Sequence, residues 1–425
     1  MKKQTTNQIT TIQTEKFKTT VIKVSFKAAL DRQTITQRIL LANVLRNSSK
    51  KFASKKALSA HLEALYGATL SVSTKKQGKG HGINFYIQVV NEKFLKSAPP
   101  LFEAALLTLS EIVMNPNISD QAFDAEIVNL ERRLLKEGIE SIYDDKTTYA
   151  LKKMVATMCE EEDFGVSGDG YIEDLAGINE ETLVKTYESM LNNDEIDIVI
   201  LGDVIHEDVI QLVAENFSLQ SQMRAKLEVI DRDEKAPAQV RVLKETQLVN
   251  QTKLNIGYRT FTRITDEDYF AMLVFNGVFG AFAHSKLFVN VREKESLCYY
   301  CGAQLDNFKG LMYVYSGLDL TQVPKAIKII DKQLEDICRG NVTENELLLA
   351  KKSIINAKRE SLDSSSGMLS DLEMRTLLDL ETDEFIAKIE AITVADLSRV
   401  AQKIKKDTVF TLEPNGPDAT MEVSE

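Results

Sequence analysis

Two periods of hydrophobic and polar residues alternate along the first half of the chain. Strict alternation is typical of half-buried strands, and apolar residues three and four apart are typical of amphipathic helices. Strands are predicted at Val21–Lys27, Thr69–Ser73, Ile83–Val90 and Ile196–Leu201, with an apolar stretch at His61–Tyr66 and helices at Ile35–Leu45, Leu101–Met114, 119–142 and Glu181–Leu191. Ser119 is the predicted N-cap of the third of these helices.

The second half runs through a similar order of elements. It is predicted to contain strands at Lys253–Tyr258, Cys298–Leu305, Gly310–Ser316 and Thr408–Leu412, with helices at Tyr269–Val278, Ser285–Arg292, Val323–Cys338, Thr343–Leu362 and Thr393–Lys403. Thr343 and Glu346 have the spacing of a capping box. The offset from Ile83 to Leu311 is 228 residues, and the offset from Ser119 to Thr343 is 224. Chance similarity is the alternative, but order, type and spacing agree, which favours an internal duplication.

The predicted fold class is therefore α+β, with two similar domains that each hold a mixed sheet with helices mainly on one face. The domains are expected at 1–224 and 247–425, joined by a linker at 225–246 whose centre is polar and contains proline. After Leu412 the tail is acidic and lacks periodicity, so it is expected to be loose.

Composition narrows the functional classes. The chain has 425 residues, of which 44% are hydrophobic and 27% charged, as in ordinary globular proteins. Its net charge of −11 argues against nucleic-acid binding, which needs a basic surface. The N-terminus is polar, without the apolar region of a secretory signal, and no apolar stretch is long enough to span a bilayer. A cytoplasmic protein with no membrane or nucleic-acid partner is expected.

The cysteines and one acidic run are weak candidates for chemistry. Cys159, Cys298, Cys301 and Cys338 are too few and too scattered for a disulfide framework. Cys298 and Cys301 have the spacing of a redox or zinc pair, but in a strand residues three apart face opposite sides. Free thiols in a reducing cytoplasm are therefore expected. The acidic run at 160–163 is interpreted as a solvated loop.

One stretch carries a specific resemblance. Residues 285–299 read SKLFVNVREKESLCY, preceded by NGVFG at 276–280, and residues 61–68 read HLEALYGA. The combination of Leu-Phe, Arg-Glu-Lys and Leu-x-Tyr strongly resembles the C-terminal signature of the pitrilysin/insulysin metallopeptidases, and the earlier stretch is similar to part of their N-terminal domain. The resemblance extends over nearly the whole chain, because that family also has a duplicated α+β architecture.

The resemblance implies a zinc motif that this chain does not keep. Catalytic family members carry His-x-x-Glu-His, in which two histidines bind zinc and the glutamate acts as general base. The alignment places this motif at residues 39–43, where Ile39 and Asn43 replace the histidines and Ala42 replaces the base. A shifted alignment does not restore the ligands, since residues 31–56 contain no histidine or glutamate. Aliphatic side chains have no lone pair for zinc, and Asn is a poor ligand.

The third ligand position is also changed. The Asp144–Asp145 pair places it at Gly138, beside Glu137. The four histidines, at positions 61, 81, 206 and 284, do not have the spacing of a ligand pair. The sequence therefore predicts no zinc, no other cofactor and no catalytic residue of its own, although an active peptidase with an unrecognised site is a third alternative to the readings below.

Arg292 and Tyr299 are the remaining candidates. In the family an Arg and a Tyr at this spacing reach from the C-terminal domain into the active-site chamber, where guanidinium engages peptide oxygens and the phenol donates to an oxyanion. The alternative is an ion pair of Arg292 with Glu293 or Glu295 and an ordinary strand tyrosine. Tyr300 is the neighbouring candidate, but alternation places it on the other face of the sheet.

Two functions remain open. In the first, the chain is the non-catalytic subunit of a heteromeric zinc metallopeptidase, inactive alone, which binds peptide and lends Arg292 and Tyr299 to a zinc-bearing paralogous subunit. A homodimer is the other assembly considered. In the second, the chain is a stand-alone scaffold that binds a peptide or protein without cleaving it. The sequence does not separate them.

Overall fold

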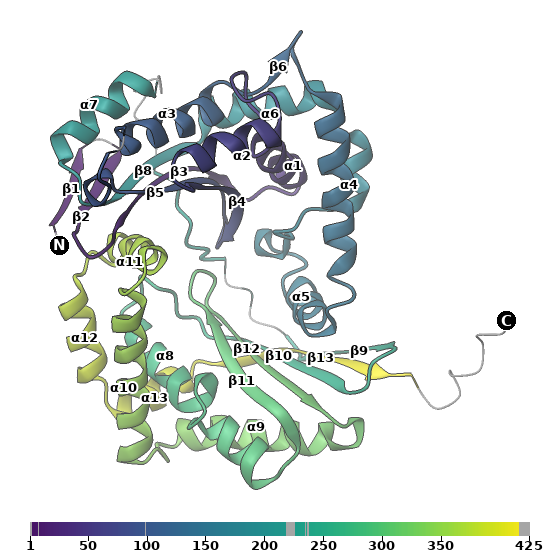
Figure 1. Cartoon of the computed structure of the whole chain (residues 1–425). Helices are drawn as coiled ribbons and strands as arrows, with labels where there is room; N and C mark the ends of the chain where they lie inside the picture. Colours follow the sequence, from purple (N-terminus) through teal and green to yellow (C-terminus); the bar gives the residue numbers. More distant parts are fainter. Residues whose placement is uncertain are drawn as a thin grey trace. The chain divides into compact units, whose positions relative to one another are not determined.

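The computed structural model describes residues 2–6, 8–97, 99–217, 226–233, 235 and 238–415. The chain forms two compact units, each with its own sheet (Figure 1). The first unit contains Met1–Glu140 and Val166–Val229, and the second contains Ser141–Gly165 and Ile230–Glu425. Residues 141–165 therefore lie in the first half of the sequence but belong to the second unit.

The first unit is built on a six-stranded mixed sheet. The strand order is β1 (Lys2–Thr6), β2 (Ile9–Gln13), β8 (Glu195–Gly202), β3 (Thr19–Ala29), β5 (Gly80–Val90) and β4 (Thr69–Gln77). Burial alternates along β5, as its sequence pattern predicts, so the apolar side chains of one face enter the core. That core is shared with helices, which are α1 (Ile35–Leu45), α2 (Lys55–Ala64), α3 (Leu101–Met114), α4 (Ala125–Ser141), α6 (Glu180–Asn193) and α7 (His206–Asn216).

The second unit has a five-stranded sheet with helices on both faces. Its strand order is β11 (Cys298–Asp306), β12 (Leu311–Leu318), β10 (Thr252–Arg259), β13 (Lys405–Pro414) and β9 (Arg241–Gln247). Its other helices are α8 (Tyr269–Asn276), α9 (Val323–Cys338), α10 (Glu344–Ser361), α11 (Ser365–Leu378), α12 (Thr382–Ala391) and α13 (Val394–Ala401). Helix α5 (Lys146–Met158) covers the face opposite α9 (Figure 1). Its Ala150 and Met154 share a core with β12 and β13.

The two sheets repeat one topology. The order β2-β8-β3-β5-β4 in the first unit matches β9-β13-β10-β12-β11 in the second. The pairs β2–β8 and β9–β13 are parallel, and the other pairs of these two five-strand orders are antiparallel. The predicted α+β fold with two similar domains is confirmed.

Two helix starts show where local patterns succeed and fail. Thr343 caps α10 as predicted, and Thr343 and Glu346 form a capping box. The prediction of Ser119 as an N-cap is wrong, because Ser119 belongs to a short hairpin of β6 (Ile118–Ser119) with β7 (Ala122–Phe123). Helix α4 begins after Asp124, whose carboxylate accepts hydrogen bonds from the first backbone amides of the helix.

The linker and tail differ in part from expectation. Residues 241–246 of the predicted linker form most of β9, which pairs in parallel with β13. Positions 225, 234, 236 and 237 of the linker and residues 416–425 of the tail lie outside the described residues. The prediction of a loose tail after Leu412 is wrong at residues 413 and 414, because these residues belong to β13. The predicted domain boundaries remain a prediction. No helix in the described part of the chain is long and apolar enough to cross a membrane.

Candidate functional site

The positions to which the sequence alignment assigns the family's zinc motif, residues 39–43, lie on α1 in the first unit. Ile39 and Ala42 are buried in the hydrophobic core, and Asn43 is partly buried. The Asn43 carbonyl accepts a hydrogen bond of 2.7 Å from Asn47 Nδ2. Ile39 packs close to Gly170, where an added Cβ would lie 3.3 Å from Ile39 Cδ1. Apolar packing therefore occupies the place where ligands would be needed.

The third ligand position offers no donor either. Gly138 lies on the exposed side of α4, and an added Cβ there would meet no atom within 4 Å. Within the residues that the structure describes, no group of three or more His, Cys, Asp or Glu side chains is arranged to hold a metal ion. The side chains at positions 39, 42 and 138 have no lone pair to give, so the residues present do not fit a catalytic zinc.

Tyr299 lies on a β-bulge at the edge of the second unit's sheet. In the pairing of β11 with β12, Cys298 faces Leu318 and Tyr300 faces Gly317, so Tyr299 is an extra residue. Bulges re-aim side chains and occur often beside functional sites. The Tyr299 side chain is 76% exposed. Tyr300 instead covers Gly317, where an added Cβ would lie 2.5 Å from its ring.

Arg292 lies on the π-helical turn Phe288–Lys294, in place of the regular helix predicted to end there. Its guanidinium carbon is 4.5 Å from the centroid of the Phe288 ring, in a cation–π contact. Glu295, one of the alternative partners, pairs instead with Lys325 at 2.6 Å. Arg292 and Tyr299 are thus both exposed in one unit, and their role in function remains a prediction.

The same bulge changes the expectation for the cysteines. Cys298 faces Leu318 and Cys301 faces Ser316 across the ladder. Leu318 and Ser316 are two residues apart in β12 and so point to the same face. The expectation that the two cysteines face opposite sides is therefore wrong, because the extra residue shifts the alternation by one position.

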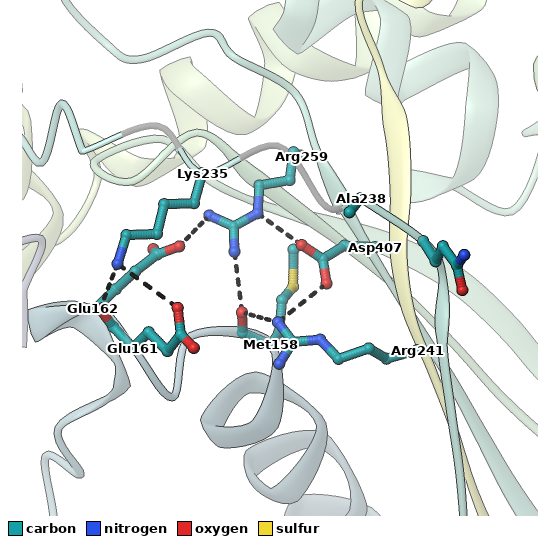
Figure 2. Close-up of a pocket in the computed structure, with 9 residues that line it drawn as sticks. Met158, Glu161, Glu162, Lys235, Ala238, Arg241, Arg259 and Asp407 are labelled. Atoms are coloured by element: carbon teal, nitrogen blue, oxygen red, sulfur yellow. Dashed lines mark hydrogen bonds and ion pairs between the residues drawn. The ribbon is translucent and has the colours of Figure 1, made fainter.

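The second unit also contains a polar pocket of about 280 Å³ beside the end of α5 (Figure 2). Arg259 is its central side chain. Its guanidinium pairs with Glu162 at 2.7 Å and with Asp407 at 2.8 Å, and donates to the Met158 carbonyl at 2.9 Å. Hydrogen bonding to Asp407 and the charge of Glu162 outweigh burial and raise the pKa of Arg259.

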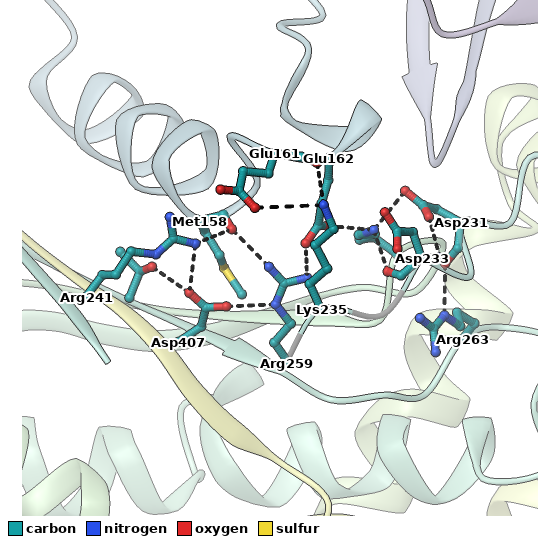
Figure 3. A network of polar contacts seen from close by, with 12 residues as sticks. Met158, Glu161, Glu162, Asp231, Asp233, Lys235, Arg241, Arg259, Arg263 and Asp407 are labelled. Atoms are coloured by element: carbon teal, nitrogen blue, oxygen red, sulfur yellow. Dashed lines mark hydrogen bonds and ion pairs between the residues drawn. The ribbon is translucent and has the colours of Figure 1, made fainter. Parts of the chain in front are cut away.

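The network extends beyond the pocket (Figure 3). Lys309 bridges Glu162 at 2.7 Å and Asp231 at 3.0 Å, and its own side chain is fully buried. The interpretation of residues 160–163 as a solvated loop is therefore wrong at Glu162, which is 8% exposed. Opposite charges satisfy one another here, as buried ions require. The network fastens the segment that follows α5 to the sheet, and sequence spacing carried no signal of it.

Comparisons with known proteins agree with this architecture. Residues 177–354 match the family model described as "Peptidase M16 inactive domain". The chain is 35% identical over 404 residues to the "Probable inactive metalloprotease YmfF" of Bacillus subtilis (strain 168). The alignment covers 95% of this chain and 94% of the relative. It is 22% identical to the "Uncharacterized zinc protease SCO5738" of Streptomyces coelicolor, over 70% of this chain and 67% of the relative.

A solved structure has the same fold over nearly the whole chain. The crystal structure of a conserved protein from Enterococcus faecalis V583 superposes with a TM-score of 0.89 at 33% identity, covering 96% of each chain. The fold, the degenerate motif positions and these similarities define a metallopeptidase-like protein. The chain belongs to the M16 family, that of pitrilysin and insulysin, and is a homologue of its inactive members. The predicted family is confirmed.

Proposed function

We propose that this chain is the non-catalytic subunit of a heteromeric zinc metallopeptidase. In this proposal it binds peptide and lends Arg292 and Tyr299 to the active site of a zinc-bearing paralogue. The observation that carries the proposal is the exposure of Tyr299 on a bulge, with Arg292 exposed seven residues earlier, in a chain whose zinc positions hold Ile39 and Ala42.

The chemistry of the two side chains suits a shared site. A guanidinium provides a fork of N–H donors for peptide carbonyl or carboxylate oxygens. A phenol hydroxyl can donate to the oxyanion that develops when a metal-bound water attacks a peptide. Neither group needs zinc in its own chain. Zinc proteases occur among the relatives of this chain, which supports a paralogue as the partner rather than an unrelated protein.

The cytoplasm is the proposed location. All four cysteines are free thiols, the state that a reducing compartment maintains. Peptide is the proposed substrate class, and neither nucleic acid nor a membrane is part of the proposal, given a net charge of −11.

The test is reconstitution with a zinc-bearing M16 paralogue from the same genome. The full chain alone should bind no stoichiometric zinc and cleave no peptide. The mixture should elute as one complex and cleave peptides. Arg292→Ala and Tyr299→Phe should leave complex formation unchanged, but lower turnover by about 10²–10³ if an oxyanion donor is lost.

Matched controls come from the same unit. Tyr143 is 50% exposed, so Tyr143→Phe removes a comparable hydroxyl, and Lys294→Ala removes a neighbouring charge; both should leave turnover unchanged. Full activity of the Arg292 and Tyr299 variants in a complex that requires this chain would contradict the shared-site role. Peptide binding by the chain alone, without any active complex, would instead identify a scaffold.

A further inference from the structure

The strongest unassigned feature is the cysteine pair on β11. Cys301 is almost fully buried, whereas Cys298 is partly exposed. Both face the same side of the sheet, where Cys298 pairs across the ladder with Leu318 and Cys301 pairs with Ser316. In the part of the chain that the structure describes, no further His, Cys, Asp or Glu joins them in a group of three. The pair therefore favours thiol chemistry over metal binding.

The two thiols are not equivalent. The hydrogen bond with Cys301, another with Ser316 and the charge of Arg292 together lower the pKa of Cys298 to about 7, against the opposing effect of burial. The hydrogen bond with Cys298 and burial raise the pKa of Cys301 well above its usual value. Cys298 is thus the thiol that loses its proton more readily, and Cys301 the one that retains it, as in reactive dithiols.

The expected separation of the two Cα atoms lies at the upper end of the range found in disulfides. Residues on one face of a strand that are two positions apart are about 6.6–6.8 Å apart between Cα atoms, from a rise of about 3.3–3.4 Å per residue. The bulge gives Cys298 and Cys301 this same-face relation. Disulfides are found up to about 6.8 Å between Cα atoms. A disulfide also needs Cβ atoms about 3.5–4.5 Å apart, so the bulge must contract when the bond forms. Since β11 is an edge strand, this contraction disturbs only one neighbouring strand.

We propose that Cys298 and Cys301 form a peroxide-reactive dithiol that closes into a disulfide. The Cys298 thiolate attacks one oxygen of hydrogen peroxide, which breaks the O–O bond, forms a sulfenic acid and releases hydroxide. The Cys301 sulfur then attacks the Cys298 sulfur and displaces the hydroxyl group, which leaves as water with the Cys301 proton. Two electrons pass from the sulfurs to the peroxide. This inference does not rest on the proposed subunit role.

The other cysteines are placed differently. Cys159 is fully buried at the C-terminal end of α5, in the core that this helix shares with the sheet. Burial raises the pKa of Cys338, with a further contribution from the charge of Glu335. A thiol with a raised pKa holds little thiolate at neutral pH, and the thiolate is the form that reacts with peroxide. Oxidation should therefore be confined to the pair on β11.

The test treats the reduced full chain with hydrogen peroxide at neutral pH, blocks remaining thiols with iodoacetamide and analyses the digested protein by mass spectrometry. The peptide containing residues 298–301 should lose two hydrogen atoms, resist alkylation and recover after dithiothreitol. Cys159 and Cys338 should stay reduced. Alkylation of Cys298 should rise with pH around 7, whereas Cys338 should need a higher pH.

Single variants separate this pair from general oxidation. Cys298→Ser should abolish the reaction, and Cys301→Ser should stop it at a sulfenic acid that dimedone traps on Cys298. Cys301→Ala repeats the test if the serine variant is misfolded by circular dichroism, and Cys338→Ser is the matched control with wild-type behaviour. The proposal is overturned if wild type forms no internal disulfide, if disulfides link two chains, or if Cys298 oxidises further at the same rate with and without Cys301.

Discussion

Single residues make the described part of the first unit unsuited to a zinc site of the family's kind. Ile39 and Ala42 are part of a continuous hydrophobic core, so the space that ligands would line is filled. Asn43 keeps a polar side chain only where α1 is partly exposed. Restoring the motif thus requires more than exchanging side chains, because ligand orientation depends on outer-shell hydrogen bonds as well.

A substitution on α1 tests this view. Ala42→Glu places a carboxylate at a position that is 1% exposed. We expect overpacking to lower the free energy of unfolding by about 1–3 kcal/mol, with a further loss from burying an unpaired charge. Urea unfolding followed by circular dichroism measures the change.

Gly138→Glu is the control for that prediction. The position is exposed within α4 and has space for a Cβ, so removing a helix glycine should stabilise the protein by up to about 1 kcal/mol. Equal effects of the two substitutions would show that position 42 is not packed as described.

At the scale of elements, the placement of α5 depends on residues that are distant in the sequence. Its apolar side chains cover β12 and β13, and its Tyr149 hydroxyl donates to Glu245 of β9 at 2.7 Å. Beyond its C-terminus, Glu162 binds Arg259 and Lys309 in a buried network. Apolar packing holds the helix along its length, and the ion pairs of Glu162 hold the segment that follows its C-terminus.

Removing one member of that network should be costly. Glu162→Ala leaves Arg259 and Lys309 buried with one partner fewer each, although Asp407 and Asp231 remain. Breaking a buried ion pair from one side costs about 3–5 kcal/mol, and we expect the lower end of this range.

Glu161→Ala is the matched control for Glu162. The Glu161 side chain is 78% exposed, and its Oε2 atom makes a long contact of 3.9 Å with Lys235 Nζ. Its loss should therefore change the free energy of unfolding by less than about 0.5 kcal/mol. Thermal unfolding of the two variants, measured in parallel, distinguishes them. A small effect of Glu162→Ala would contradict the proposal that the network stabilises the segment after α5.

At the scale of the whole molecule, the two units do not divide the sequence at one point. Residues 141–165 come from the first half, but supply a covering layer for the second sheet. Without that segment, the apolar side chains of β12 and β13 lose the partners that α5 and the residues after it provide, among them Ala150, Met154 and Phe164. A cut in the predicted linker would therefore expose one face of the second sheet.

Fragments test this organisation. A fragment in which a flexible Gly/Ser linker replaces residues 166–229 and joins residues 141–165 to residues 230–425 should be soluble and unfold in one cooperative transition. Residues 230–425 alone should aggregate or bind hydrophobic dyes, since large exposed apolar patches drive association. Analytical ultracentrifugation and calorimetry provide the measurements. Cooperative, monomeric unfolding of the shorter fragment would refute the structural role of α5.

The sequence by itself determined what depends on local pattern: the strands and helices with strong periodicity, the Thr343 capping box and the duplication. It also fixed the residue types at Ile39, Ala42 and Gly138, whose assignment to the zinc motif stays a prediction. It also singled out the stretch that places the chain in its family.

Only the tertiary structure decided the rest. The bulge at Tyr299 depends on pairing with a strand, and so does the shared face of Cys298 and Cys301. The placement of residues 141–165 in the second unit and the burial of Glu162 depend on partners between about 100 and 260 residues away, such as Arg259 and Phe410. Periodicity records which side of an element is apolar, but not which distant surface that side will meet.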